Sequence, residues 1–144
     1  IDKIIYDIQE YFLSQRDYDD VPGTYVLDSR SYRKGYYLNM FLMTLNKSIH
    51  RDEFASNEKD YLDKFNVSEE QKQAVISRDY LQMLKLGANV YYTFKLVSHD
   101  RLQPQFMYGK MSDPELSFEE FQQMMLSGGR PIEGNRSKKE KKNG

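Results

Sequence analysis

The residues best suited to metal binding or proton transfer near neutral pH are two histidines, His50 and His99. They are far apart in the sequence, and neither has a second histidine within helical reach. A mononuclear iron or zinc site usually takes two or three imidazoles and a carboxylate. This chain could supply such a site only if the fold brought both histidines to one carboxylate. Otherwise they are surface or helix-end residues. We therefore expect no catalytic and no metal-binding residue on this chain.

Other chemistry-bearing motifs are missing from the sequence. It has no cysteine, no G-x-S-x-G turn and neither of the two common glycine-rich phosphate loops. Gly128-Gly129-Arg130 pairs two glycines with a cation, but the pair follows a predicted helix and indicates its end. The sequence therefore does not predict an enzyme that works alone.

Tyrosine is the residue type that stands out. The chain has 144 residues, with 12 Tyr and 8 Phe but no Trp. Tyrosine offers a rigid apolar ring with a polar tip, which suits an interface or the wall of a pocket for an aromatic ligand. The alternative is that these rings form half-buried edges of the core. The candidates are Tyr25, Tyr36, Tyr37, Tyr91, Tyr92, Phe106 and Tyr108.

Charge and hydropathy limit the partners and the compartment. The net charge is −1, which gives no overall attraction to nucleic acid or to an anionic membrane. No apolar run approaches the length of a membrane span. The acidic, amphipathic start of the sequence is unlike a signal peptide, so we expect a cytoplasmic protein with no nucleic-acid and no membrane partner.

The elements that must position these residues are helices. Apolar residues recur at three- and four-residue spacing, and the pattern predicts a single all-α domain of five to seven short helices over 1–129, with an extended basic tail over 130–144. The predicted segments are a helix over 1–14, a turn over 17–25, a helix over 29–48 capped by Asp28, a short helix or broken pair over 50–65, a helix from the capping box at Ser68 to Gly87, a helix over 89–97, an irregular segment over 99–116 and a helix from the capping box at Ser117 to Leu126.

The predicted helix over 29–48 carries two further expectations. Gly35 lies in its interior at a cost of about 1 kcal/mol relative to Ala, and it would allow another backbone to approach closely. The predicted core face of this helix consists of Tyr32, Tyr36, Leu38 or Asn39, Leu42, Met43, Leu45 and Ile49.

Several blocks together resemble one known family, the alpha (small) subunit of protocatechuate 4,5-dioxygenase. They occur in the family's order and cover roughly residues 18–137. The blocks are 20–26 (Asp-Val-Pro-Gly-Thr-Tyr-Val), 33–41 (Arg-Lys-Gly-Tyr-Tyr-Leu-Asn-Met-Phe), 61–63 (Tyr-Leu-Asp), 78–80 (Arg-Asp-Tyr), 87–91 (Gly-Ala-Asn-Val-Tyr), 111–112 (Met-Ser), 119–125 (Glu-Glu-Phe-Gln-Gln-Met-Met) and 128–130 (Gly-Gly-Arg).

The resemblance implies an all-helical small subunit of a class III extradiol dioxygenase. In that family a separate large (beta) subunit holds the Fe(II), and the usual assembly is α2β2. The small subunit packs over the mouth of the active site, where protocatechuate or a related catechol acid is opened beside its diol. On this basis we expect a lid over the substrate pocket formed by Tyr25, Tyr91, Tyr92, Pro104, Phe106 and Tyr108, and a partner interface formed by Pro22, Gly23, Arg33, Lys34, Tyr36, Tyr37 and Asn39.

The sequence also departs from the family. The first helix is more apolar than in the family, and the end is rich in lysine. Pro104 stands where the family's lid tends to have an aromatic residue, and we expect this difference to alter which ring substituents are accepted. Three alternatives stay open. The first is a standalone helical binding module of the same fold, and the second is a catalytic domain in its own right. The third is the small domain of a fused gallate-type dioxygenase, which is considered because the sequence begins at Ile1 without Met.

Overall fold

The structure is a computed structural model that describes residues 1, 3–5, 8 and 16–131. The chain divides into two compact units. One consists of residues 27–129, and the other of residues 1–26 with 130–144. Most of the helix predicted over 1–14 and most of the basic tail predicted over 130–144 lie outside the described residues. In the second unit, residues 17–23 form turns and bends, as predicted for 17–25.

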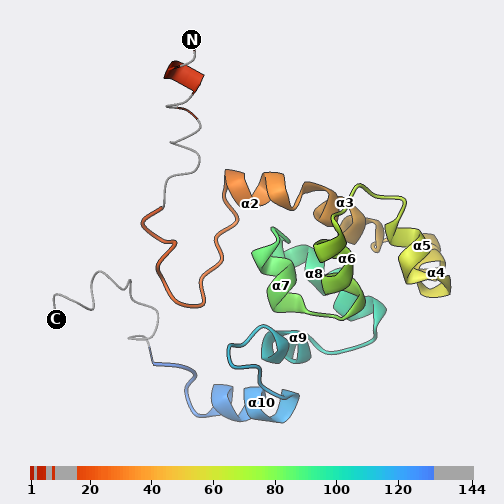
Figure 1. The fold of residues 1–144 in the computed structure, drawn as a ribbon. Coiled ribbons are helices and arrows are strands. Elements are labelled where there is room, and N and C mark those ends of the chain that lie inside the picture. Colours follow the sequence, from red (N-terminus) through yellow and green to blue (C-terminus); the bar gives the residue numbers. More distant parts are fainter. Residues whose placement is uncertain (2, 6–7, 9–15, 132–144) are drawn as a thin grey trace. The chain divides into compact units, whose positions relative to one another are not determined.

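Helices, and no strand, make up the regular structure of the described residues, so the predicted all-α class is confirmed. Residues 27–129 contain nine helices, more than the five to seven predicted (Figure 1). They are α2 (Ser29–Lys34), α3 (Tyr36–Thr44), α4 (Ser48–Ser56), α5 (Glu58–Leu62), α6 (Glu69–Ile76), α7 (Tyr80–Lys85), α8 (Val90–His99), α9 (Pro104–Lys110) and α10 (Phe118–Leu126).

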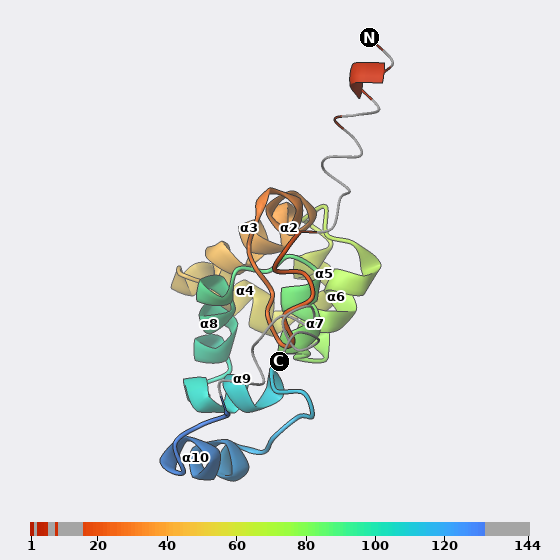
Figure 2. The same ribbon diagram turned by 90° about the vertical axis from the view of Figure 1, so that its left-hand side faces the viewer.

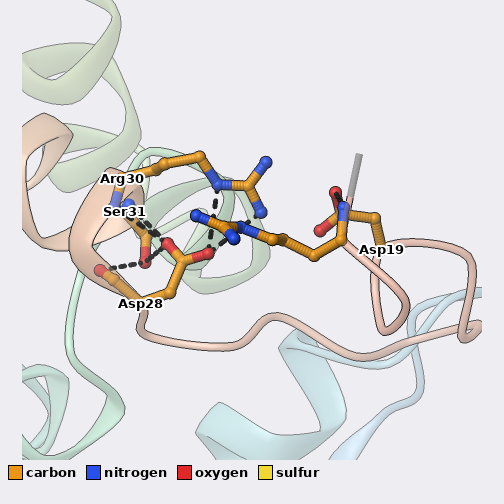
Figure 3. Close-up of polar contacts among 5 residues, drawn as sticks. Asp19, Asp28, Arg30 and Ser31 are labelled. Atoms are coloured by element: carbon orange, nitrogen blue, oxygen red, sulfur yellow. Dashed lines mark hydrogen bonds and ion pairs between the residues drawn. The ribbon is translucent and has the colours of Figure 1, made fainter. Parts of the chain in front are cut away.

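The helix predicted over 29–48 is broken at Gly35, which separates α2 from α3. Its predicted cap is confirmed: the Asp28 carboxylate accepts hydrogen bonds from the backbone N–H groups of Arg30 and Ser31, each at 3.0 Å (Figure 3). The same carboxylate accepts from the Arg30 guanidinium at 2.9 Å. These contacts fix where α2 begins, and the contact of Gly35 with Gly87 described below fixes where it ends.

The core face predicted for this helix is partly wrong. Tyr32, Met43 and Ile49 are exposed, and Tyr36 is 42% exposed. The prediction is confirmed for Leu38, Asn39, Leu42 and Leu45, which are buried. With Phe41, which was not predicted, the three leucines form a core stripe that is 0–1% exposed and spaced as one helical face. Because α3 has apolar side chains all round, the spacing alone did not determine which face turns inward.

The helix predicted from Ser68 to Gly87 is also two helices. Its capping box is confirmed, with Ser68 and Gln71 exchanging side-chain and backbone hydrogen bonds. The break between α6 and α7 falls at Arg78, whose φ of 56° is incompatible with a continuous right-handed helix. Over 50–65, where a short helix or a broken pair was predicted, the structure has the pair. The helix over 89–97 and the second capping box at Ser117 are confirmed.

The prediction of an irregular segment over 99–116 is wrong, because α9 lies within it. Pro104 is the first residue of α9, a position where proline's missing N–H costs nothing. Met107 is fully buried, and Gly109 lies so close to the carbonyl of Leu116 that a Cβ would be 2.5 Å from that oxygen. Pro104 therefore begins a helix, although the prolines of this segment were interpreted as residues that prevent one.

The packing of this unit places α3 against α8, α4 against α5, and α6 against α5 and α7. Its centre includes the rings of Phe41, Phe54 and Tyr61, which meet edge to face at centroid distances of 5.2–6.1 Å. The helix α9 contacts α7, α8 and α10, and α10 lies on the far side of α9 from the other helices (Figure 2). The unit therefore has one main core with the α9–α10 pair at its end.

Candidate functional site

The two histidines border the aromatic centre of the core. The His50 ring lies 6.3 Å from the Tyr61 ring, and the His99 ring lies 5.0 Å from the Phe54 ring. Within residues 16–131 and the few described residues before them, no three His, Asp or Glu side chains gather as metal ligands would. The prediction that Fe(II) is held by another chain is not tested by this arrangement and stays a prediction.

A close backbone contact joins the α2–α3 junction to the loop between α7 and α8. A Cβ on Gly35 would lie 1.9 Å from the carbonyl oxygen of Gly87, and a Cβ on Gly87 would lie 2.3 Å from the carbonyl oxygen of Ser31. Gly87 also has a positive φ of 93°, which disfavours any L side chain. Both positions therefore require glycine, and the predicted close approach at Gly35 is confirmed.

Two buried side-chain amides hold this junction together. Asn39 donates from Nδ2 to the carbonyl of Gly87 at 2.9 Å and accepts at Oδ1 from the backbone N–H of Asn89 at 2.8 Å. Gln71 donates to the carbonyls of Lys34 and Leu86 at 3.0 and 3.2 Å. We call these two side chains the amide clamp. Because Asn39 is only 5% exposed, its side chain acts inside the domain and not on the surface where a partner contact was predicted.

The clamp positions most of the residues predicted as a partner interface. Tyr36 and Tyr37 follow the junction directly, with half-exposed rings that meet edge to face at 5.2 Å. Lys34 precedes it and donates from Nζ to the carbonyl of Lys85 at 3.3 Å, and Arg33 is exposed beside it. The other predicted interface residues, Pro22 and Gly23, are exposed in a turn of the second unit.

The predicted lid residues fall in separate places. Tyr91 and Tyr92 form the first turn of α8, their rings 5.7 Å apart, and Asn89 caps this turn by accepting from the N–H of Tyr91. Tyr91 is 61% exposed, with the Lys95 ammonium 4.9 Å from its ring centroid. Tyr92 packs against the core, while Tyr25 is exposed in the second unit.

The remaining lid residues lie on α9. Pro104 is exposed at its start, and Phe106 is half-buried with the Lys110 ammonium 5.9 Å from its ring. Tyr108 lies between Phe94 and Phe121, at 5.9 and 5.8 Å. Among the described ring contacts, none joins the Tyr91–Tyr92 pair to those on α9. A cavity of about 360 Å³ between α9 and α10 is lined by Gln105, Tyr108, Phe121, Gln122, Met125 and Leu126.

Sequence reasoning missed an ion cluster centred on Arg78. Its guanidinium donates to both oxygens of Glu58 at 2.5 and 2.9 Å and to both oxygens of Asp100 at 2.6 and 2.9 Å. Burial disfavours the charged guanidinium, but the hydrogen bonds to Asp100 and Glu58 outweigh this and raise the Arg78 pKa. The cluster ties together α5, the α6–α7 junction and α8, so its role is structural.

Arg78 has a buried tyrosine beside it in the sequence. Tyr80 is fully buried, and its hydroxyl has no hydrogen-bond partner among the described residues. Burial is the main cause of its raised pKa, with a further contribution from the charge of Asp100. In the block 78–80, Tyr80 therefore lies inside the domain, and Arg78 is mostly buried.

Comparison with known families identifies the chain. Residues 38–126, from α3 to the end of α10, match the family described as aromatic-ring-opening dioxygenase LigAB, LigA subunit. The chain belongs to the LigA family. The resemblance to the small subunit of protocatechuate 4,5-dioxygenase, seen first in the sequence, is thereby confirmed, and the chain is a dioxygenase subunit of this family.

In this LigA chain, the blocks that carried the resemblance include parts of its internal framework. Block 33–41 supplies Gly35 and Asn39, and block 87–91 supplies Gly87 and Asn89. Block 78–80 supplies Arg78, the centre of the ion cluster. Across the described part of the chain, no helix is both long and apolar enough to cross a membrane.

Proposed function

We propose that this chain assembles with a large subunit of an extradiol dioxygenase and covers the mouth of that subunit's active site. The observation that carries the proposal is the LigA family match over residues 38–126. The exposed tyrosines on either side of the amide clamp support it, because they offer two rigid aromatic surfaces with a fixed geometry. The assembly that we propose is an α2β2 tetramer in the cytoplasm.

We propose that the cofactor, Fe(II), is held entirely by the large subunit. When bound there, it would supply the coordination of the catechol diol and of O2 that ring opening beside the diol requires. The part of the small subunit is to exclude water and shape the pocket. On this chain, Tyr91, Pro104 and Phe106 are suited to that part, because Tyr91 and Pro104 are exposed and Phe106 is partly exposed.

The proposed substrate is protocatechuate or a related catechol acid, with 4-carboxy-2-hydroxymuconate semialdehyde as the product from protocatechuate. The chain offers a cation near one lid surface, Lys95 beside Tyr91, whereas Lys110 beside Phe106 is paired with Glu115 at 2.5 Å. The Lys95 ammonium would favour an anionic substrate on its way to the pocket. Pro104, at the start of α9, is the position we expect to influence which ring substituents are accepted.

Co-expression with the candidate large subunit tests this proposal. The pair should co-purify and consume O2 with protocatechuate, gallate or another catechol acid, and iron should be found in the large subunit. Stoichiometric iron in the separately purified small chain would contradict the assignment of the metal. No O2 uptake by the pair with any catechol acid would contradict the assignment of the activity.

A further inference from the structure

The helix α3 is apolar on two opposite faces, but the domain covers only one of them. Its inward stripe of Leu38, Phe41, Leu42 and Leu45 is buried. The opposite face carries Tyr36, Tyr37, Met40 and Met43, each 42–46% exposed. Residues 36–46 include no charged side chain at all. A helix covered on one side usually turns charged residues to solvent on the other, and one that is apolar all round is usually buried.

This exposed surface continues onto α2 and ends in a hollow. Tyr32 is 54% exposed, and its ring meets that of Tyr36 edge to face at 6.2 Å. At the other end is a depression of about 320 Å³, lined by Met40, Met43, Thr44, Asn46, Lys47 and His50. We call Tyr32, Tyr36, Tyr37, Met40 and Met43 the outer face of α3. Tyrosine and methionine are enriched at the cores of protein interfaces, where charged residues are depleted.

The segment that carries the outer face is positively charged. Residues 28–51 contain five Arg or Lys residues and one acid, Asp28, which pairs with Arg30 at 2.9 Å, so the net charge is +4 (5 − 1). The five cations are Arg30, Arg33, Lys34, Lys47 and Arg51. A second copy of this chain would bring like charges together at such a surface, which opposes self-association. The complementary partner has an apolar patch with acidic residues at its rim.

We propose that the outer face of α3 docks on the large dioxygenase subunit, at an apolar patch with an acidic rim. This inference rests on the proposed function, which supplies the partner, and adds where on this chain the partner binds. The face is ready for docking because Gly35, Gly87 and the amide clamp already fix α3 against the start of α8.

The test measures the dissociation constant between the full chain and the purified large subunit for Met40→Glu and Met43→Glu. Each substitution should weaken binding about 30-fold or more, the effect of removing an interface hot spot. Met40→Leu, which keeps the apolar contact, should bind nearly as well as the unmodified chain. The control is Ile76→Glu, at another exposed apolar residue on α6, which should leave binding unchanged. Binding of the unmodified chain should also weaken as salt is added, because the rim is charged.

The outcomes separate this inference from the proposed function. No binding by the unmodified chain would overturn both. Normal binding by the unmodified chain and equally by Met40→Glu would overturn only the placement of the interface. Self-association of the free chain that Met40→Glu abolishes would assign the face to a second copy. A further comparison measures the effect of Met40→Glu on the melting temperature of the free full chain and of a chain that starts at residue 16. A decrease in the full chain alone would mean that residues 1–15 cover the outer face, and this result would also overturn the inference.

Discussion

The backbones of Gly35 and Gly87 touch, and neither position has room for a side chain. A Cβ on Gly35 would lie 1.9 Å from the Gly87 carbonyl oxygen, well inside any permitted contact. This contact joins the end of α2 to the end of α7, although the two glycines lie in different sequence blocks. It explains why a glycine that costs helix stability stands in the middle of an otherwise helical segment.

Replacing either glycine should destabilise the domain through steric overlap. Gly35→Ala adds a methyl group at a position with an ordinary φ of −92°, so its effect is steric alone. We expect a loss of about 3 kcal/mol in the free energy of unfolding, at the upper end for overpacking. Urea unfolding followed by circular dichroism measures it.

Gly128→Ala is the matched control for the backbone conformation of Gly87. Gly87 and Gly128 both have a positive φ, but nothing lies within 4 Å of a Cβ on Gly128. Gly128→Ala should therefore cost only about 1 kcal/mol, the penalty of the left-handed conformation, and Gly87→Ala clearly more. Equal losses for these two variants would contradict the close contact.

Removing the Asn39 amide should expose its role in the clamp. Asn39→Leu leaves the Gly87 carbonyl and the Asn89 N–H buried without their partner, at about 1–3 kcal/mol for an unsatisfied polar group. Amide hydrogen exchange at residues 88–92 should accelerate, because these residues begin α8. Asn46→Leu, at an exposed position after α3, should leave that exchange unchanged. If both variants behaved alike, the clamp would not hold the start of α8.

The Arg78 cluster should be the most sensitive ionic feature of the fold. Arg78→Met leaves Glu58 and Asp100 without their partly buried partner, and breaking such a pair typically costs about 3–5 kcal/mol. Lys64→Met removes an ion pair with Glu53 whose side chains are half-exposed, and such pairs are worth at most about 1 kcal/mol. Thermal unfolding of the two variants compares them. A similar, small shift for both would show that Arg78 is dispensable.

The proposed lid residues should affect substrate binding and leave iron unaffected. Deleting the whole of 103–108 is not a clean test, because Met107 in α9 is fully buried. Point variants avoid this difficulty: Tyr91→Ala and Phe106→Ala in the assembled enzyme should raise KM or change the preferred catechol acid, because each removes an exposed or half-exposed ring. Loss of iron with unchanged substrate preference would place these residues away from the substrate.

The sequence was sufficient for the fold class because the signals for helices are local. The capping boxes at Ser68 and Ser117 and the cap at Asp28 depend on side chains within one turn, and all three are confirmed. The breaks at Gly35 and Arg78 could not be predicted from periodicity. They depend on contacts with Gly87 and with Glu58 and Asp100, which are distant in sequence.

The candidate site could be predicted only in part for the same reason. Tyr36 and Tyr37 are exposed, but spacing cannot distinguish them from a core stripe, since α3 is apolar on both sides. Asn39 belongs to the same sequence block as the surface tyrosines, yet it is buried. The cavity between α9 and α10 depends on α9, which lies in the segment that was predicted to be irregular. The one available sign in the sequence was that Asn39 is a polar residue within an uncharged, apolar segment, which indicates a hydrogen-bond partner inside the domain.

The most direct test of the central claim is O2 uptake by the iron-loaded large subunit as this chain is added. We predict that ring cleavage of a catechol acid rises with added small subunit and saturates when the two are present in equal amounts. Met40→Glu should shift the curve to higher concentration. A rate that does not change with added small subunit, for any catechol acid, would contradict the account.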